Sequence, residues 1–587
     1  MTLRVRWLGR VPYREAWALQ RALHERSPDD HVLLLEHPHV YTLGVRADLR
    51  HVLVPPAEVG AELVRTDRGG DVTYHGPGQL VGYPIVSLPA KRGGRHGMAD
   101  TVAYVRSVEQ LLIDSLAEVG LPGAGRLREH PGVWVDPDGD DPRKIAAIGV
   151  RLTRGRSMHG FALNVAPDMR YWRHIVPCGI PDKGVTSLAE EGLDVSLRTV
   201  TEVVARRAAA LWGDLSGDGG PVDLRGVAWR HRPDDLAPFS RGRGPGRAVS
   251  AGGRVVDDGR GEATVEGEPP AGGEVAVRLH GRLAEAGVTE GLAITGRKPP
   301  WLRATFRTDP SYLRLERTMR DLDLVTVCQE AGCPNIYECW GRDGTATFMI
   351  NGERCTRACG FCLVDTRHPR PLDPGEPDRV AEAVERMGLA FAVVTAVARD
   401  DLADGGAEGF ARTIGAIRRR TPATQVEVLI PDCKGDEAAL ATIFAARPDV
   451  LNHNVETVPR LQRAVRPSAG YARSLAVLAR AKEAGLTTKS GLIVGMGEDD
   501  DEVASTLADL RAVGVDIVTI GQYLRPTTHH LPVARWVEPA TFERYARVGE
   551  AMGIPHVESS PLTRSSYHAR QAAGSSSAAV PAGARPA

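Results

Sequence analysis

Six of the eight cysteines of this 587-residue chain fall between Cys328 and Cys362. The last three, Cys355, Cys359 and Cys362, have C-x3-C-x2-C spacing. Three such thiolates hold three irons of a four-iron cluster and leave the fourth iron open, and an open coordination position is a chemical site. The spacing therefore predicts a reactive iron–sulfur cluster. A zinc knuckle is the alternative, and it is disfavoured because the nearest further ligand, His368, has no partner at finger spacing.

A second triplet, formed by Cys328, Cys333 and Cys339, has C-x4-C-x5-C spacing. It predicts a second cluster that again lacks one protein thiolate. Further along, residues 491–498 read GLIVGMGE, in which a strand-like run leads into a glycine-rich loop. Such a loop lets the backbone approach an adenine ring closely. The loop alone is a weak signal, and its place four strands after the cysteines strengthens it.

Two cysteines stand apart, Cys178 and Cys433. Cys433 follows the apolar run VEVLIP, and an isolated cysteine at a strand end is interpreted as a packing residue rather than a ligand. Cys178 lies in the loop sequence HIVPCGIPDKGVTSL, and by itself it too would be a buried, inert thiol. The glycine-rich stretch 68–78 lacks the GK[ST] ending of a phosphate-binding loop. These residues alone leave the role of Cys178 open.

The composition excludes several classes of protein. Lys plus Arg (73) and Asp plus Glu (74) nearly cancel, so no basic excess points to a nucleic-acid partner. The longest apolar stretch, residues 389–398, is about half of what a membrane-spanning helix needs, and the N-terminal sequence MTLRVRWLGR lacks the apolar run of a signal peptide. We therefore expect a cytoplasmic protein without a membrane partner, in which clustered cysteines bind metal.

The first part of the chain, residues 1–215, reads as a mixed α/β domain. Residues 32–36 and 145–152 are apolar runs typical of buried strands, and residues 101–117 have helical periodicity. This helix is predicted to bury a stripe that contains Val102, Val105, Leu112 and Leu116.

The composition changes after this domain. Residues 216–296 are dense in Gly, Arg, Asp and Pro, which predicts a flexible linker with at most one small element, within residues 273–288. At the other end of the chain, residues 571–587 read as a disordered tail.

Residues 297–570 form the second predicted domain. Helical patterns at residues 380–387 and 410–417 alternate with strand-like runs that end in polar or glycine-rich segments. The alternation predicts a parallel sheet, open or closed into a barrel, with functional residues at the C-terminal ends of its strands. The six strand-like runs are residues 346–355, 391–402, 426–433, 450–457, 488–498 and 516–526.

The C-x3-C-x2-C motif and the GLIVGMGE run resemble the signatures of radical S-adenosylmethionine (SAM) enzymes. The upstream triplet and the stretches TATFMI, IPDCKGD, NHNVETV and IGQYLRPT resemble lipoyl synthase. The resemblance implies a partial (β/α)6 TIM barrel with two [4Fe–4S] clusters, one of them SAM-binding on Cys355, Cys359 and Cys362. It implies SAM contacts at Gly491, Ile493, Gly495 and Glu498, and auxiliary-cluster ligands at Cys328, Cys333, Cys339 and Ser566, with Ser565 as the alternative. The stretch TAVARDDLADGG departs from the family pattern, and we assign no SAM contact there.

The same resemblance implies the chemistry. An electron donor reduces the first cluster, and cleavage of the C–S bond of SAM gives a 5′-deoxyadenosyl radical. The radical abstracts hydrogen from carbons six and eight of an octanoyl chain, which no acid–base group can deprotonate. Two SAM molecules are needed, and the auxiliary cluster supplies both sulfurs.

In the first domain, the stretches at residues 68–84, 143–151 and 159–165 resemble lipoyl(octanoyl) transferase, whose fold is that of the biotin and lipoate protein ligases. The resemblance makes Cys178 the acyl-thioester nucleophile and Lys144 the cation that favours its thiolate. His75 and His159 are either polar groups near the thioester or structural histidines. The implied acyl-binding residues are Arg68, Gly69, Gly70, Asp71, Val72, Thr73, Tyr74, His75, Ala147, Ile148, Gly149, Gly160, Phe161 and Ala162.

Together the resemblances imply an α/β multidomain enzyme that performs two successive steps. Octanoyl would pass from octanoyl-acyl carrier protein to a lysine of a lipoyl carrier domain, of the 2-oxoacid dehydrogenase or glycine-cleavage H type, and two sulfurs would follow. Three alternatives remain. The first domain is an inactive carrier-docking module, the cysteine-rich domain is a structural metal module, or its substrate is a small molecule or tRNA.

Overall fold

The computed structural model describes residues 1–89, 99–213, 222–226, 282–289, 291–292, 298–302, 310–326 and 345–566. The predicted cluster ligands Cys328, Cys333 and Cys339 and the predicted tail, residues 571–587, lie outside these ranges. The chain divides into two compact units, Met1–Asp234 and Asp235–Ala587. Each unit is described by itself.

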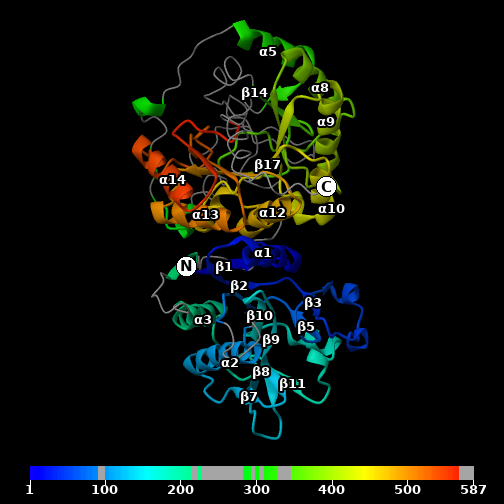
Figure 1. Ribbon diagram of the computed structural model, residues 1–587, viewed down its shortest axis with the longest axis vertical. Coiled ribbons are helices and arrows are strands. Elements are labelled where there is room, and N and C mark those ends of the chain that lie inside the picture. Colours follow the sequence, from blue (N-terminus) through cyan, green and yellow to red (C-terminus); the bar gives the residue numbers. More distant parts are fainter. Residues whose placement is uncertain are drawn as a thin grey trace, which may run out of the picture. The chain divides into compact units, whose positions relative to one another are not determined.

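The first unit is built on a nine-stranded mixed sheet (Figure 1). The strands predicted at residues 32–36 and 145–152 are confirmed as β2 and β9. Because β9 and β10 pair in antiparallel register at the centre, the functional residues predicted on these two segments become neighbours. The strand order is β12 (Val222–Gly226), β1 (Leu3–Arg10), β2 (Asp30–Glu36), β6 (Gln79–Ile85), β10 (Arg156–Asn164), β9 (Arg143–Thr153), β8 (His130–Val135) and β7 (Gly125–Leu127), with β11 (Gly184–Val185) beside β9.

Helices α2 (Thr101–Glu118) and α3 (Leu197–Trp212) share one apolar core with this sheet, and α1 (Tyr13–Arg26) packs on β6 and β10. The predicted helix at residues 101–117 is therefore confirmed. Its predicted stripe is wrong at Val102, which is 66% exposed. Val102 lies in the first turn, just after the N-cap Asp100, before the helix reaches the core. Leu112 and Leu116 are buried as predicted, and the buried face also contains Tyr104, Val108, Glu109, Leu111 and Ser115.

A three-stranded sheet of β4 (Glu62–Arg65), β3 (Val40–Leu43) and β5 (Val72–His75) completes the first unit. Its aromatic core includes Tyr41 and Tyr74 from the strands and Trp172 from the short helix η3 (Met169–His174). This core anchors the segment that follows η3, which contains Cys178.

The second unit has seven parallel strands preceded by one antiparallel strand. The six predicted strands correspond to β14–β19, and the sequence analysis missed β20, a short and polar strand with the sequence HVES. The order follows the chain: β13 (Val325–Thr326), β14 (Thr345–Ile350), β15 (Phe391–Ala396), β16 (Gln425–Leu429), β17 (Val450–Asn452), β18 (Thr488–Val494), β19 (Ile517–Gln522) and β20 (His556–Ser559).

Helices surround these strands on the outside (Figure 1). The periodicities at residues 380–387 and 410–417 are confirmed in α8 and α9, whose apolar faces are buried. This arrangement leaves the C-terminal ends of the strands to carry the functional loops. The helices are α5 (Pro310–Asp321), α8 (Glu376–Met387), α9 (Ala407–Arg420), α10 (Glu437–Ala445), α11 (Gln462–Val465), α12 (Tyr471–Glu483), α13 (Asp500–Ala512) and α14 (Pro539–Ala551).

The interior of this sheet is layered. At the N-terminal ends of the strands, Phe391, Val393, Val450 and Ile517 form a small apolar cluster. The next layer is polar: Nζ of Lys489 lies 3.0 Å from a carboxylate oxygen of Glu427, and both side chains are fully buried. The Nδ2 atom of Asn452 donates to the other Glu427 oxygen at 3.0 Å. The interior is thus apolar at its N-terminal end and becomes polar toward the other.

The interval predicted as linker, residues 216–296, is not linker throughout. Strand β12 pairs with β1, and Asp223 bonds with Arg4 and Arg6 at 3.0 and 2.9 Å. Near the other end, Leu283 is buried and Leu292 pairs with Val533 of the second unit. Average composition conceals such short ordered stretches. The rest of the interval lies outside the described residues.

Candidate active sites

Cys178 is held in a tight turn of the first unit. It lies in η4 (Pro177–Gly179) with a left-handed backbone (φ +57°), and its side chain is half-buried. The N–H group of Val176 donates to the carbonyl of His51 at 2.8 Å, and η4 packs against β5. Within the described ranges the thiol has no hydrogen-bond partner. A strained, half-buried and unpaired thiol fits a nucleophile better than the inert packing cysteine expected by default.

Arg68 provides a fixed cation near this thiol. Its guanidinium is buried and donates to the carbonyl and hydroxyl oxygens of Thr42 at 2.6 and 2.8 Å. Burial lowers the pKa of Arg68, and the nearby Tyr13 and Cys178 partly offset that effect. An arginine remains charged despite such a shift, so a fixed positive charge lies near Cys178.

The second predicted catalytic residue, Lys144, is on β9. It is buried, and its Nζ lies 4.7 Å from the centre of the Trp134 ring, in a cation–π contact. Its main chain pairs with Val185 of β11, the strand that follows η4. The structure thus connects the Lys144 and Cys178 segments through β11. No hydrogen bond joins the two side chains in the described part of the unit.

The predicted acyl-binding residues come from three segments that meet. The β9 residues pair with the β10 residues, with Gly149 opposite Gly160, Ile148 opposite Phe161 and Ala147 opposite Ala162. A Cβ built on Gly149 would lie only 3.0 Å from the carbonyl oxygen of Gly69 and 3.1 Å from Cδ of Arg68. Gly149 therefore lets the start of the third segment, Arg68 and Gly69, lie directly against β9.

His75 and His159 both have protein partners. Nδ1 of His75 lies 2.8 Å from Oε1 of Gln79, and Nε2 of His159 lies 2.7 Å from Oδ1 of Asp67. Burial lowers the pKa of both, that of His159 to about 3 with help from Arg68. Two buried, neutral and bonded rings favour the structural interpretation left open by the sequence.

In the second unit the three cysteines of the C-x3-C-x2-C motif follow β14, at the C-terminal edge of the sheet. The N–H group of Cys355 donates to the carbonyl of Asp365 at 2.7 Å, and that of Leu531 donates to the carbonyl of Gly360 at 3.0 Å. Burial raises the pKa of all three thiols, that of Cys359 to about 11. The thiols are therefore protonated until a metal displaces the protons.

This donor set fits an iron–sulfur cluster. No three His, Cys, Asp or Glu side chains of the described ranges converge as ligands of one metal ion do. A four-iron cluster does not need its ligands to converge on one ion, because each thiolate binds a different iron. Three thiols on one short loop can therefore hold such a cluster.

An arginine between the first two cysteines anchors their loop, and the sequence analysis missed it. The guanidinium of Arg357 forms a bidentate pair with Asp400 (2.8 and 2.8 Å) and a further bond with Asp432 (2.6 Å). The backbone N–H group of Arg357 donates to Sγ of Cys355 at 3.4 Å. Burial opposes ionisation of Asp432, but Arg357 holds the pKa of that carboxyl well below its usual range. The loops after β15 and β16 are thus tied to the cysteine loop by buried charges.

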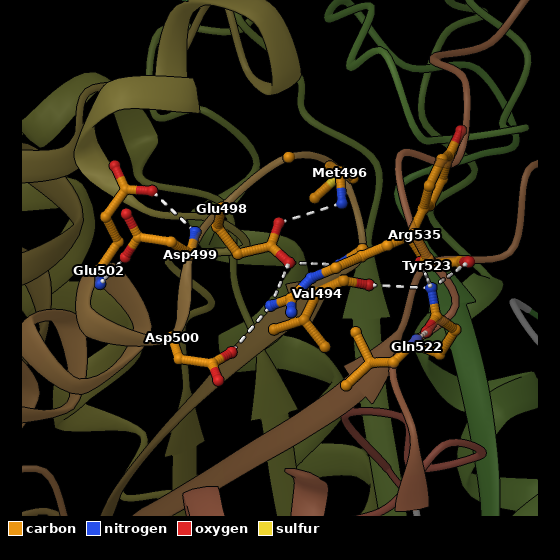
Figure 2. Close-up of polar contacts among 12 residues, drawn as sticks. Val494, Met496, Glu498, Asp499, Asp500, Glu502, Gln522, Tyr523 and Arg535 are labelled. Carbon is orange, nitrogen blue, oxygen red and sulfur yellow. Dashed lines mark hydrogen bonds and ion pairs between the residues drawn. The ribbon is translucent and has the colours of Figure 1, made fainter. Parts of the chain in front are cut away.

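The predicted SAM loop follows β18 (Figure 2). Both carboxylate oxygens of Glu498 turn back to accept N–H groups of the loop, one from Gly495 and one from Met496 at 3.0 Å. Gly495 has φ +99°, and a Cβ there would lie 2.1 Å from Nε2 of Gln522. Gln522 itself donates to the carbonyl of Val494 at 3.2 Å. Glu498 therefore shapes the loop, and Gln522 is a supporting residue that the motif does not reveal.

The C-terminal RSSY segment reaches the same end of the strands. Ser565 accepts a hydrogen bond from Nδ2 of Asn454 at 2.8 Å, whereas the Ser566 hydroxyl has no partner among the described residues. Asn454 follows β17, and its Oδ1 would be 2.7 Å from a Cβ at Gly491. Cys433, by contrast, is buried in the large apolar cluster of this unit, in agreement with a packing role.

Family models match both units. The model described as lipoyl protein ligase A/B catalytic domain matches residues 12–209, and the radical SAM superfamily model matches residues 349–510. The fold and sites thus define a radical SAM enzyme joined to a lipoyl ligase-type catalytic domain. No helix of the described residues is long and apolar enough to cross a membrane.

Curated relatives narrow the assignment of the chain to a family. The chain is 58% identical over 276 residues to lipoyl synthase of Rubrobacter xylanophilus, covering 86% of that protein and 47% of this chain. It is 53% identical over 297 residues to lipoyl synthase of Mycolicibacterium paratuberculosis, covering 94% of that protein and 51% of this chain. The chain belongs to the lipoyl synthase family. It is an enzyme in which an acyltransferase domain is joined to a sulfur-inserting radical SAM domain.

Among solved structures, a bipartite lipoate protein ligase of Thermoplasma acidophilum, described with its E2 lipoyl domain, is 19% identical, with a TM-score of 0.31. The match covers 38% of this chain and 86% of that one.

Proposed function

We propose that this chain performs two successive steps of lipoyl assembly on one carrier. The first unit moves octanoyl from octanoyl-acyl carrier protein to Cys178 and then to a lysine of a lipoyl carrier domain. The second unit inserts sulfur at carbons six and eight of that octanoyl group. The carriers are lipoyl domains of the 2-oxoacid dehydrogenase or glycine-cleavage H type.

One observation carries this proposal: a lipoyl ligase-type domain and a lipoyl synthase domain are parts of one chain. The octanoyl amide that the first unit would make is the substrate that the second would consume. Among the first-unit residues, Cys178 accepts the acyl group, and Lys144 is its cationic partner and serves the incoming carrier lysine. Arg68 is a second, buried cation at the acyl site. The paired β9 and β10 segments and residues 68–75 form the acyl site.

In the second unit, Cys355, Cys359 and Cys362 would hold a SAM-binding [4Fe–4S] cluster. Cys328, Cys333, Cys339 and Ser566 would hold an auxiliary one, with the Ser566 hydroxyl favoured because Ser565 is already bonded to Asn454. When bound, the clusters supply an electron for SAM cleavage, drawn from an external donor, and the sulfur atoms. Around SAM, the residues Gly491, Ile493, Gly495 and Glu498 form the backbone cradle.

Gly495→Ala is expected to weaken SAM binding by about tenfold. The left-handed φ and the 2.1 Å approach to Gln522 mean that a methyl group must displace the loop, at a cost of about 1–3 kcal/mol. Equilibrium dialysis of SAM against cluster-loaded protein measures the change. Gly388→Ala is the matched control, because Gly388 also has a positive φ (+61°) but nothing lies within 4 Å of its added Cβ. Equal affinity in Gly495→Ala and wild type would contradict the assigned role.

The proposed function is tested by intact-mass analysis of an apo carrier domain. The carrier is incubated anaerobically with cluster-loaded enzyme, octanoyl-acyl carrier protein, SAM and a reductant. We expect a mass shift for octanoylation, followed by a second shift for two sulfurs. A stop at the octanoyl adduct with both clusters present would contradict sulfur insertion, and no shift at all would contradict both steps.

A further inference from the structure

A histidine–aspartate pair lies beside the loop of Cys178. His51 ends the short helix η1 (Leu49–His51), and its Nδ1 lies 2.8 Å from Oδ2 of Asp71. The other Asp71 oxygen accepts backbone N–H groups of Val72 (2.6 Å) and Asp48 (3.3 Å). The carboxylate is thus fixed by the backbone. As an acceptor, it makes Nδ1 of His51 the protonated nitrogen and Nε2 the basic one.

Two contacts place this pair against η4. The carbonyl of His51 accepts the N–H group of Val176 at 2.8 Å. A Cβ built on Gly179 would lie 2.7 Å from Oδ2 of Asp71 and 3.3 Å from Cε1 of His51. Gly179 directly follows Cys178 and has φ +70°, so any other residue would be strained and would push the pair away. The glycine lets the pair approach the turn that carries the cysteine.

His51 is the best-placed base near this turn. Its side chain is 30% exposed, and within the described part of the chain its Nε2 has no hydrogen-bond partner. His75 and His159 are buried and bonded to Gln79 and Asp67. Lys144 lies over the Trp134 ring.

We propose that His51 is a catalytic residue of acyl transfer and that Asp71 is its positioning residue. The inference rests on the proposed function of Cys178 as acyl acceptor. Nε2 takes the Cys178 proton as sulfur attacks the thioester carbonyl; the donor C–S bond breaks, and the proton passes to the leaving thiolate. In the second half-reaction the acceptor amine attacks and the Cys178 C–S bond breaks. Lys144 serves the incoming amine, and the amine proton ends on the departing cysteine sulfur.

Several charged groups surround η4. His51 and Asp48 lie on the η1 side, and Arg68 and Asp71 lie on the β5 side. Beyond the turn, Asp182 and Lys183 pair with each other at 3.5 Å. Arg68 is a permanent cation. Among the groups named, His51 is the base with an unbonded ring nitrogen next to the turn.

The test is the pH dependence of Cys178 alkylation by iodoacetamide in the full-length protein, followed by mass spectrometry of the peptide 174–183. His51→Gln is expected to alkylate about tenfold more slowly at pH 7, because the base that takes the Cys178 proton is missing. Asp71→Asn is expected to slow alkylation in the same way but by less. His174→Gln is the matched control, because His174 lies on the same segment but bonds to Tyr41 at 2.9 Å.

A wild-type profile in folded His51→Gln would overturn the proposal. Circular dichroism checks folding, and if His51→Gln does not fold, a wild-type profile in Asp71→Asn overturns it equally. Alkylation uses no acyl donor, so this result is independent of the proposed function. If the variants have a shifted profile but the wild-type enzyme transfers no octanoyl, the His51–Asp71 pair does act on Cys178 and the assigned reaction is wrong. If the variants have the wild-type profile and the wild-type enzyme does transfer octanoyl, only the proposed role of the His51–Asp71 pair is wrong.

Discussion

Cys178→Ser is expected to lower octanoyl transfer to the carrier by about 10³-fold or more. The thiol is the group that accepts the acyl chain, and a serine hydroxyl in the same turn does not ionise near neutral pH. The left-handed backbone and the contacts of η4 do not depend on the Sγ atom, so the unit is expected to fold unchanged. The measurement is intact mass of the carrier after incubation with octanoyl-acyl carrier protein.

The same variant distinguishes the activities of the two units. With a carrier that already bears octanoyl groups, Cys178→Ser should insert sulfur at the wild-type rate, because none of the second-unit residues is altered. Cys433→Ser is the control for a general loss of thiols, since Cys433 is buried in the apolar cluster. Octanoyl transfer by Cys178→Ser at near wild-type rate would contradict the thioester route. It would leave the first unit as a docking module or as an enzyme of different mechanism.

Asp432→Asn is expected to lower the affinity of the second unit for its cluster by about 10–100-fold, as removal of outer-shell partners of metal ligands commonly does. Asp432 and Arg357 are both buried and lie 2.6 Å apart, so removing one charge leaves the other partly uncompensated. Arg357 would keep only Asp400 as a partner, and the loop that carries Cys355 would lose one of its two anchors. Iron and sulfide per chain after a fixed reconstitution report the effect.

Asp516→Asn provides the matched control for this variant. Asp516 also forms a close ion pair, with Lys482 at 2.6 and 2.7 Å, but it lies just before β19, at the opposite edge of the sheet. It should lose stability without losing iron. Equal iron content in Asp432→Asn and wild type would show that the charge pair does not position the cysteine loop.

The elements and motifs that depend on local residue spacing could be predicted from the sequence. The C-x3-C-x2-C loop, the strands β2 and β9, and the helices α8 and α9 are all where their patterns predicted. These features depend on residues that are close in the chain, such as the i, i+3, i+4 repeats of α8. The strand β20 was missed because its four residues, HVES, carry too few apolar side chains to stand out.

The parts that the sequence could not predict depend on contacts between distant residues. Arg357 meets Asp400 and Asp432 only because β14, β15 and β16 are adjacent in the sheet. His51 and Asp71 meet across η1 and the segment before β5, and although Asp71 lies in the family-like stretch 68–84, no local pattern pairs it with His51. Val102 shows the reverse error: periodicity placed it on the buried stripe, but the first turn of α2 extends beyond the core.

The packed N-terminal end of the second unit's strands separates what holds the fold from what does the chemistry. Phe391, Val393, Val450 and Ile517 form an apolar cluster there, followed by the buried Lys489–Glu427 pair. The cysteine loop and the loop after β18 begin at the other end of the same strands. A change in these loops therefore need not disturb the packed core.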